Sequence, residues 1–563
     1  MEILLFIFPL LSFLIFQFFN QKIRSEILYA INIFLFGLSF LLSLYIFIKI
    51  LNLDNDLPLF FYTFIKLESL FMDWKLRFDL LVSGLAALVT FIGLLITIYS
   101  INISKNNVFN FQINSYLSLS IFGLLVLISS NNLIQFFLGW YIIILSSYFI
   151  SNISENKVDC KNVFFENRIS DLCFFLSLYF IYKFSNSINF DVIFKNFQMI
   201  ESKITILNKT FSSFQIVILI LFFSFLLRFR QFYISDSRYD LLKFNSSLYS
   251  LILYGLYFPV GVYFILRFLT LTHISLYYSH VILILGFILS FIFLFLLIRT
   301  YNLKKLFLYI TSAQFSILLI AVGLKLYNAL VFHFFTSTIS LLILSLSFGI
   351  ISYKLNNEQD IRKMGHLIVK CPSMFLFILI GFISLLGIPY FSGFYSNQLF
   401  LSQLSLSNEE NYFLILSYCF FYTFIISYIS FKIILIVFLG QNNCNIHLYN
   451  KIEDGSNYLK FILLVLSVFI IFSGWYFNNL FSGNFGENIW RLVLVGGTKF
   501  SLNHNLYNNQ WIFETRNIVC YIGIFLAFLN YLIFPKLGDN LKLKNNKLFK
   551  YYLKSFTSYD FNR

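Results

Sequence analysis

Ionisable side chains that interrupt long apolar stretches are the residues of this sequence with the clearest chemical potential. An ionisable group is costly inside a membrane, so each such residue is a functional candidate by default. Titratable groups linked by water can carry protons through lipid when their pKa values lie near the working pH. We therefore group these residues as a candidate polar axis for proton movement. Its members are Arg168, Asp171, Arg228, Arg230, His333 and Lys432.

Structural roles account for some of these residues equally well. Arg168 and Asp171 are three residues apart, so on a helix they share one face and can form an ion pair at the membrane interface. A lone histidine on an apolar helix, such as His333, is more often a hydrogen-bonded core residue. The sequence alone leaves both alternatives open.

Arg228 and Arg230 carry charges that stay fixed. Arginine keeps its proton in proteins, so neither side chain can exchange a proton as a desolvated lysine does. A charge buried in lipid costs roughly 2.5–3.5 kcal/mol on insertion scales, so both guanidinium groups need partners. The nearest candidates in the sequence are Asp236, Asp240 and tyrosine hydroxyls.

The composition is that of a protein that crosses a membrane many times. Of its 563 residues, 59% are hydrophobic and 12% are charged, and the mean hydropathy is +0.81. Apolar runs near the length that a membrane-spanning helix needs recur along the chain. The sequence therefore predicts an all-α polytopic membrane protein with about fifteen transmembrane helices.

The net charge of +15 and the cysteines limit the classes of partner and cofactor. The lysines and arginines lie in loops and at helix ends, which favours contact with membrane lipids and no nucleic acid. The six cysteines are scattered, without a Cys-x-x-Cys pair or a Cys/His cluster, and no glycine-rich phosphate loop is present. We therefore expect this chain to bind no metal, iron–sulfur cluster or nucleotide cofactor.

Residues 359–398 contain the signal for a broken helix. A charged loop at 359–366 precedes an apolar span that Gly387, Pro389 and Gly393 interrupt. Proline removes a backbone donor and glycine loosens the turn, so the freed carbonyls need a protein or water partner inside a membrane. We expect a discontinuous helix of the kind found in transporter cores, or else a loop between two short helices at the membrane surface.

The same stretch resembles a known family. Asp-Ile-Arg-Lys-Met-Gly at 360–365 and Gly-Ile-Pro-Tyr-Phe-Ser-Gly-Phe-Tyr-Ser at 387–396 are similar to blocks of subunit 5 of respiratory complex I, the mitochondrial NADH:ubiquinone oxidoreductase. The resemblance covers about residues 70–441 by motif, and the chain is identified as a divergent member of that family. Further similar blocks lie, in the family's order, at 73–81, 139–140, 167–171, 261–267 and 304–314.

The resemblance also implies which residues would carry protons, and many of them are replaced. A family glutamate corresponds to Tyr141, a family lysine to Arg228, and another lysine to Leu341. Two family histidines correspond to Leu253 and Ser337. We therefore expect a degraded proton path, through which this subunit conducts protons poorly or not at all.

Some of the family's polar pattern is retained. His333 matches a family histidine, and the family has a basic residue at the place of Lys432. In the broken helix, however, the family's Ser-Lys-Asp is replaced by Ser396-Asn397-Gln398. Arg168 and Asp171 belong to an Asn-Arg-Ile-Ser-Asp block that resembles the family's Asn-Arg-Ile-Gly-Asp.

The family fold implies two inverted five-helix repeats, each with one broken helix. We expect the first repeat at 113–271 and the second at 278–440. Transmembrane helices precede them at 1–112 and follow them at 441–536, and a basic tail covers 537–563. We place this tail on the matrix side, because basic segments stay on the side of synthesis.

The resemblance implies a core subunit of the membrane arm of complex I in the mitochondrial inner membrane. The neighbouring antiporter-like subunit 4 and other membrane-arm subunits would be its partners. NADH, FMN, iron–sulfur clusters and ubiquinone would be bound elsewhere in the complex. Family members continue into a long lateral helix, which we expect here to be absent, shortened or supplied by another polypeptide. Two alternatives stay open, a free-standing proton/cation antiporter and a pump-inactive scaffold of the membrane arm.

Overall fold

The computed structural model describes residues 2–533 except 20–23, 54–56, 68–69, 104–107, 153–156, 191, 194–202, 207–208, 229–257, 269–275, 357, 407–411, 445 and 483–509. Ten helices of this part are long and apolar enough to cross a membrane. Three shorter apolar helices lie at Leu4–Phe19, Ile216–Leu227 and Pro372–Leu386. The all-α polytopic class is confirmed, whereas the total of about fifteen spans stays a prediction for the whole chain.

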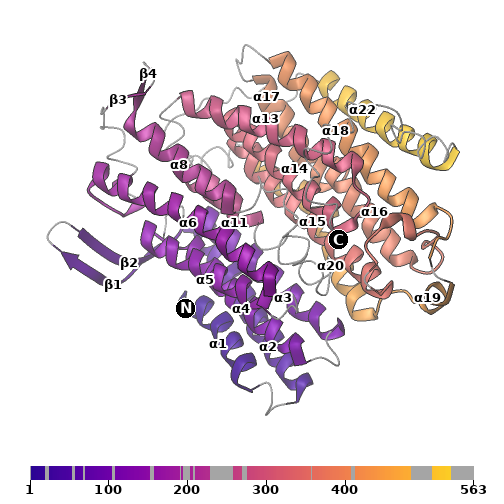
Figure 1. Cartoon of the computed structure of the whole chain (residues 1–563), viewed down its shortest axis with the longest axis horizontal. Coiled ribbons are helices and arrows are strands. Elements are labelled where there is room, and N and C mark those ends of the chain that lie inside the picture. The colour runs from indigo at the N-terminus through magenta and orange to yellow at the C-terminus, as the bar shows by residue number, and fades with distance from the viewer. Residues whose placement is uncertain are drawn as a thin grey trace.

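The first half of the chain packs as a layer of neighbouring helices (Figure 1). Within it α1 and α3 each pack against α2 and α4, α4 packs along α5, and α6 packs along α8. Their bounds are α1 Leu4–Phe19, α2 Ser25–Leu53, α3 Leu80–Ile103, α4 Val108–Ile128, α5 Leu133–Asn152, α6 Lys157–Ser185, α8 Ser213–Arg228 and α11 Phe258–Arg267.

Two short hairpins accompany these helices and were not expected. Strands β1 (Leu57–Leu67) and β2 (Leu70–Phe78) pair antiparallel, as do β3 (Lys203–Ile206) and β4 (Lys209–Ser212). The block at 73–81 that resembles the family therefore begins in a strand, and the helix that follows begins only at Leu80. The reason is visible in Asp-Trp-Lys-Leu-Arg-Phe at 73–78, where polar and apolar residues alternate with the period of a strand.

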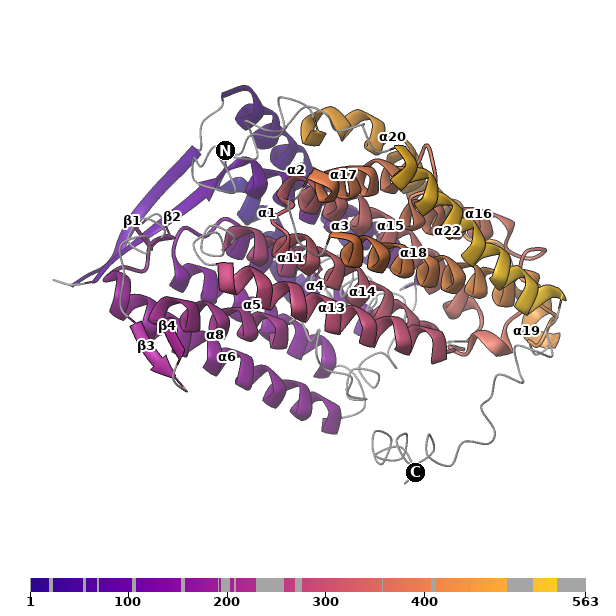
Figure 2. The ribbon, with the colours of Figure 1, turned by 90° about the horizontal axis from the view of Figure 1, so that it is seen from above.

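The second half surrounds α15, which is almost entirely buried. This helix packs against α14, α16, α17 and α20, while α22 lies along α18 (Figures 1 and 2). The bounds are α13 Leu276–Arg299, α14 Leu303–Gly323, α15 Tyr327–Lys354, α16 Pro372–Leu386, α17 Ser392–Leu406, α18 Tyr412–Ile434, α19 Ile446–Lys451, α20 Asn457–Ser482 and α22 Gln510–Phe528. A π-helical turn extends α18 to Leu439, and another extends α22 to Ile533.

A buried ion pair joins the N-terminal layer to the end of the first half. A guanidinium nitrogen of Arg267 at the end of α11 lies 2.6 Å from Asp79 Oδ2, just before α3, and both side chains are buried. The other carboxylate oxygen of Asp79 accepts from the backbone N–H of Val82 at 2.9 Å, which caps α3. Asp79 and Arg267 each belong to a block that resembles the family. Because 188 positions separate them, neither block by itself predicts that they pair.

Candidate functional site at a helix break

The interruption predicted near Pro389 is confirmed. Helix α16 ends at Leu386, and α17 begins at Ser392. Gly387 caps α16 with the left-handed φ of +67°, and its N–H donates to the carbonyl of Ser384 at 2.9 Å. Tyr390 also has a positive φ, of 74°, which is uncommon for a residue other than glycine. Gly387, Ser392 and Gly393 are buried, whereas Tyr390 in the same turn is 82% exposed, so a loop between two short helices at the membrane surface stays the alternative prediction.

Both glycines are required where the two half-helices meet. A β-carbon on Gly393 would collide with the carbonyl of Ser384, and one on Gly387 would collide with the side chains of Asn397 and Arg516. The hydroxyls of Ser384 and Ser392 lie 3.1 Å apart and connect the two ends. The two helix ends are therefore closely packed where they meet.

Arg516 of α22 satisfies the carbonyls that the break leaves free. Its guanidinium donates to the carbonyl of Gly387 at 3.1 Å and also to the carbonyl of Leu386. The side chain is buried, with 5% of its surface exposed. The C-terminal end of a helix carries a partial negative charge, so α16 itself compensates the positive charge of Arg516.

His333 lies beside the break and is linked to it through hydroxyl groups. Its Nε2 is 3.1 Å from Oε1 of Gln314, and its Nδ1 is 3.3 Å from Oγ of Ser396. Because the amide oxygen only accepts, Nε2 donates to it, and in a neutral ring Nδ1 then accepts from Ser396. Thr336 also donates to Ser396 at 3.0 Å. His333 is thus both a hydrogen-bonded core residue and a titratable group in a polar cluster.

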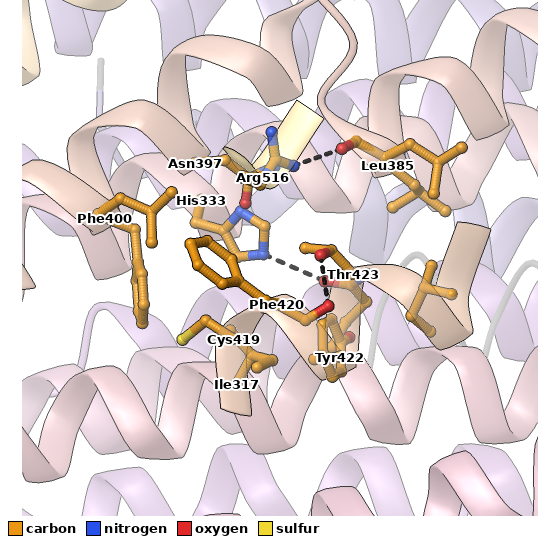
Figure 3. A pocket seen from close by; sticks show the side chains of 14 residues that line it. Ile317, His333, Leu385, Asn397, Phe400, Cys419, Phe420, Tyr422, Thr423 and Arg516 are labelled. Atoms are coloured by element: carbon orange, nitrogen blue, oxygen red, sulfur yellow. Dashed lines mark hydrogen bonds between the residues drawn. The ribbon is translucent and has the colours of Figure 1, made fainter. Parts of the chain in front are cut away.

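A cavity of about 40 Å³ lies between His333 and Arg516 (Figure 3). That volume exceeds the ~15 Å³ that one water needs, and the lining offers several polar partners. The buried hydroxyl of Tyr422 has no hydrogen-bond partner among the described residues, so water in the cavity would satisfy it. The polar lining consists of Gln314, His333, Asn397, Cys419, Tyr422, Thr423 and Arg516.

Lys432 of α18 lies near the C-terminal end of α13. Its Nζ donates to the carbonyl of Ile298 at 2.9 Å and lies 4.1 Å from the centre of the Tyr301 ring. The side chain is buried and therefore occupies the C-terminal end of α13, much as Arg516 occupies that of α16. It does not line the cavity of His333.

The predicted pairing of Arg168 and Asp171 is present, with 3.0 Å between NH2 and Oδ2. Trp140 of α5 donates from Nε1 to the same carboxylate at 3.1 Å. The guanidinium carbon of Arg168 lies 5.7 Å from the centre of the Tyr141 ring, a cation–π contact. Tyr141 stands at the place of the family glutamate, so Arg168 faces an aromatic ring there and not a carboxylate.

The remaining predicted residues lie at the edge of the described structure or outside it. Arg228 is the last residue of α8. Arg230 and its suggested partners Asp236 and Asp240 lie outside the described residues, as does Leu253. Ser337 and Leu341 are buried on α15 and contribute no titratable group to it.

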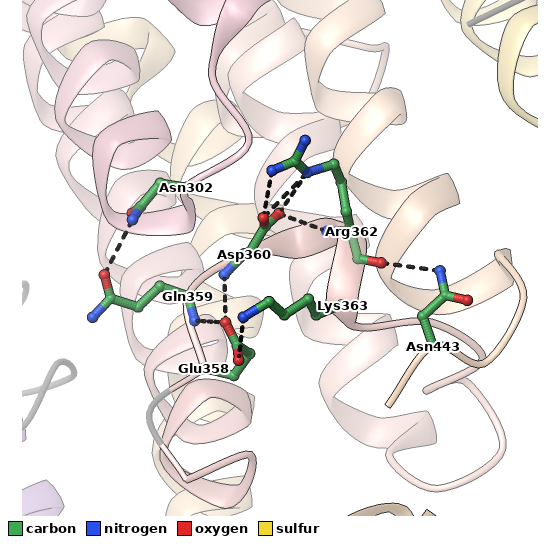
Figure 4. A network of polar contacts seen from close by, with 7 residues as sticks. All are labelled: Asn302, Glu358, Gln359, Asp360, Arg362, Lys363 and Asn443. Carbon is green, nitrogen blue, oxygen red and sulfur yellow. Dashed lines mark hydrogen bonds and ion pairs between the residues drawn. The ribbon is translucent and has the colours of Figure 1, made fainter. Parts of the chain in front are cut away.

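The charged loop at 359–366, which precedes the break, is hydrogen-bonded to the turn between α13 and α14 (Figure 4). The carbonyl of Gln359 accepts from the N–H of Leu303 at 2.8 Å, and the N–H of Ile361 donates to the carbonyl of Tyr301 at 3.1 Å. Burial raises the pKa of Asp360, but hydrogen bonds and the positive charge of Arg362 outweigh it and lower the pKa overall. The loop thereby supports the turn that Lys432 contacts through Tyr301.

Sequence reasoning missed Arg516 and Gln314. Spans were expected within 441–536 but no site residue was predicted there, whereas α22 begins at Gln510 and carries Arg516. The sequence signal that could have identified Arg516 is its place inside a run that begins with apolar residues such as Ile512 and Phe513. Among the described residues, no group of three His, Cys, Asp or Glu side chains could hold a metal ion.

Comparison with known proteins agrees with this architecture. A family model described as the transmembrane part of NADH:quinone oxidoreductase and Mrp antiporters matches residues 130–425. The chain is 27% identical over 503 residues to NADH-ubiquinone oxidoreductase chain 5 of Chondrus crispus, covering 87% of this chain and 75% of that one. It is also 27% identical over 518 residues to NADH-quinone oxidoreductase subunit L of Rickettsia typhi, covering 90% and 77%.

A solved structure shows the same fold. A chain of the Mrp complex from Dietzia sp. DQ12-45-1b superposes with a TM-score of 0.73 at 12% identity, over 98% of this chain. The superposition covers 59% of that chain, so our protein spans about three fifths of its length. The family model covers more than half of the sequence, and the resemblance of the sequence blocks is confirmed. The chain belongs to the NADH:quinone oxidoreductase/Mrp antiporter family of transmembrane proteins.

Proposed function

We propose that this chain is an antiporter-like subunit in the membrane arm of a proton-translocating NADH:ubiquinone oxidoreductase. The observation that carries the proposal is the helix break between α16 and α17, whose buried helix ends lie beside a cavity lined by polar groups and a titratable histidine. Such a break places backbone carbonyls and water within an otherwise apolar bundle, as moving a proton through lipid requires.

The proposed contribution to proton movement is reduced. Arg228 and Tyr141 stand where the family has a lysine and a glutamate, and neither substitute exchanges protons at neutral pH. His333 and Lys432 stay titratable and lie in the second of two proposed repeats, at 113–271 and 278–440. Arg168, Asp171 and Arg230 complete the proposed polar axis. Protons would therefore pass mainly through the second repeat.

The proposal also defines partners and location. The chain would lie in the mitochondrial inner membrane against other membrane-arm subunits, above all the antiporter-like subunit 4, with membrane lipids around it. NADH, FMN, iron–sulfur clusters and ubiquinone would be bound by other subunits. This chain would contribute no redox group and act only within the assembled enzyme.

Native purification tests the proposal. The chain should co-migrate with an assembly that oxidises NADH and reduces quinone, and removing it should lower proton translocation while the NADH-oxidising site survives. If the chain migrates alone and exchanges protons for cations in vesicles, the proposal is wrong and the antiporter alternative holds. The fold shared with an Mrp complex is the observation that favours this alternative.

A further inference from the structure

We propose that Arg516 is a positioning residue that supplies the fixed positive charge at the break between α16 and α17. From α22, it would hold the break in the geometry that keeps the neighbouring cavity polar and hydrated. The part of this inference that concerns proton movement rests on the proposed function. The part that concerns the placement of charge rests on contacts within the chain.

The contacts of Arg516 connect α22 to the end of α16 at the break. Its guanidinium donates to two consecutive carbonyls, those of Leu386 and Gly387, at the point where α16 can no longer supply donors. These two bonds span 130 and 129 positions of sequence, so they fix α22 against the break. A buried arginine that lost them would leave an uncompensated charge in the core.

Arg516 is also the fixed charge of the cavity. Among the described residues that line it, none is an aspartate or a glutamate, and His333 is the other residue that can carry a positive charge. Arginine stays protonated in proteins, so Arg516 cannot carry a proton across the cavity. It can orient water and polar groups, and its role is therefore positioning.

The position of Arg516 suggests that a charge has moved from one helix to another. In the family that this chain resembles, the broken helix carries a lysine where Asn397 stands here. A β-carbon added to Gly387 would meet both Nδ2 of Asn397 and a guanidinium nitrogen of Arg516, so the two side chains approach the same point. We infer that α22 supplies the charge that α17 lacks.

A charge-swap cycle tests this inference in the full-length chain. The variants are Arg516→Gln, Asn397→Lys, the double variant, and Arg516→Lys, which keeps the charge. Glu514→Gln is the matched control, because it removes a charge from an exposed position of the same helix. The first measurement is thermal stability of the purified chain. The second is the proton-to-electron ratio of the assembled fraction of the complex in sealed vesicles.

The inference predicts a pattern that a merely structural residue would not give. Arg516→Gln lowers both the melting temperature and the ratio, Asn397→Lys alone lowers stability through repulsion, and the double variant recovers most of both losses. Arg516→Lys keeps most of the ratio, and Glu514→Gln changes neither quantity. Assembled Arg516→Gln complexes with the wild-type ratio, or a double variant no better than Arg516→Gln, would overturn the inference. Failure of the proposed function is seen separately, as a wild-type chain that is not part of an NADH-oxidising assembly.

Discussion

Two buried cations of this protein, Arg516 and Lys432, lie at the C-terminal ends of neighbouring helices. Arg516 donates to the last carbonyls of α16, and Lys432 donates to the carbonyl of Ile298 near the end of α13. Free carbonyls and the helix dipole both make such an end negative, so a cation can be buried there without a carboxylate. In a membrane protein with few acidic residues, helix ends thus take the place of counter-ions.

The glycine at the break should not tolerate a side chain. Gly387→Ala forces a left-handed conformation that costs roughly 1–2 kcal/mol for an L-residue, and its methyl group would displace Asn397 or Arg516. We expect a lower melting temperature and weaker assembly. Gly37→Ala in α2 is the control, since its methyl group would meet only ordinary contact at 3.9 Å and should stabilise that helix by about 0.5–1 kcal/mol. Equal effects at both sites would contradict the role given to the break.

Lys432 allows stability and function to be separated. Lys432→Met keeps a flexible side chain, and removing the cost of burying a charge offsets the hydrogen bond lost to the carbonyl of Ile298. We expect an unchanged or higher melting temperature together with a lower proton-to-electron ratio. The control is Lys183→Met at an exposed position of α6, which should change neither quantity. An unchanged ratio in Lys432→Met would remove Lys432 from the polar axis.

At the scale of elements, long-range polar contacts decide how the helices assemble. The ion pair of Asp79 and Arg267 joins the start of α3 to the end of α11. The loop with Asp360 and Arg362 holds the turn between α13 and α14 through Leu303 and Tyr301. Each contact fixes the orientation of one helix relative to another. Apolar packing alone would define that orientation less precisely.

The pair between α3 and α11 should be expensive to break. Asp79→Asn leaves Arg267 buried without a carboxylate, and breaking such a pair costs roughly 3–5 kcal/mol. We expect a large loss of thermal stability in the purified chain, reduced further by loss of the cap on α3. Glu26→Gln, at an exposed position of α2, should stay within about 0.5 kcal/mol of the wild type. Wild-type stability in Asp79→Asn would show that this pair does not hold the layer.

The charged loop predicts a dependence of stability on pH. Burial raises the pKa of both carboxyl groups but is outweighed: hydrogen bonds and charge from Arg362 lower the pKa of Asp360, and backbone N–H donors together with Lys363 lower that of Glu358. A lowered folded-state pKa means that the stabilisation is present above the ordinary carboxyl pKa of about 4 and disappears as the pH falls through the lowered value. Melting temperature measured against pH should therefore drop below about pH 4, and Asp360→Asn should flatten part of that drop. An identical profile in the variant would exclude Asp360 as a contributor.

Much of the element pattern could be predicted from local sequence. Hydropathy gave the membrane class, and Gly387 and Pro389 predicted the break, because both act through their own backbone geometry. Arg516 could not be predicted, since its partners lie about 130 positions away and no local period encodes them. The hairpin before α3 was missed because membrane-like neighbours masked the alternation at 73–78.

At the scale of the whole molecule, the two halves differ in what they can titrate. Among the described residues of the first half, the buried acids Asp79 and Asp171 are paired with Arg267 and Arg168, and the ring of Tyr141 lies against Arg168. The second half holds the helix break, the cavity beside His333 and Lys432. Under the proposed function, this difference between the described parts of the two halves would let the chain keep the family fold while contributing less to proton movement.

The number of protons translocated per NADH tests this account most directly. The complex containing this chain would be purified, sealed into vesicles and compared with a complex whose corresponding subunit keeps the family's glutamate, lysines and histidines. We predict a lower ratio for the complex with this chain, because a fixed charge and neutral side chains replace those groups at Tyr141, Arg228, Leu253, Ser337 and Leu341. An undiminished ratio would contradict the account.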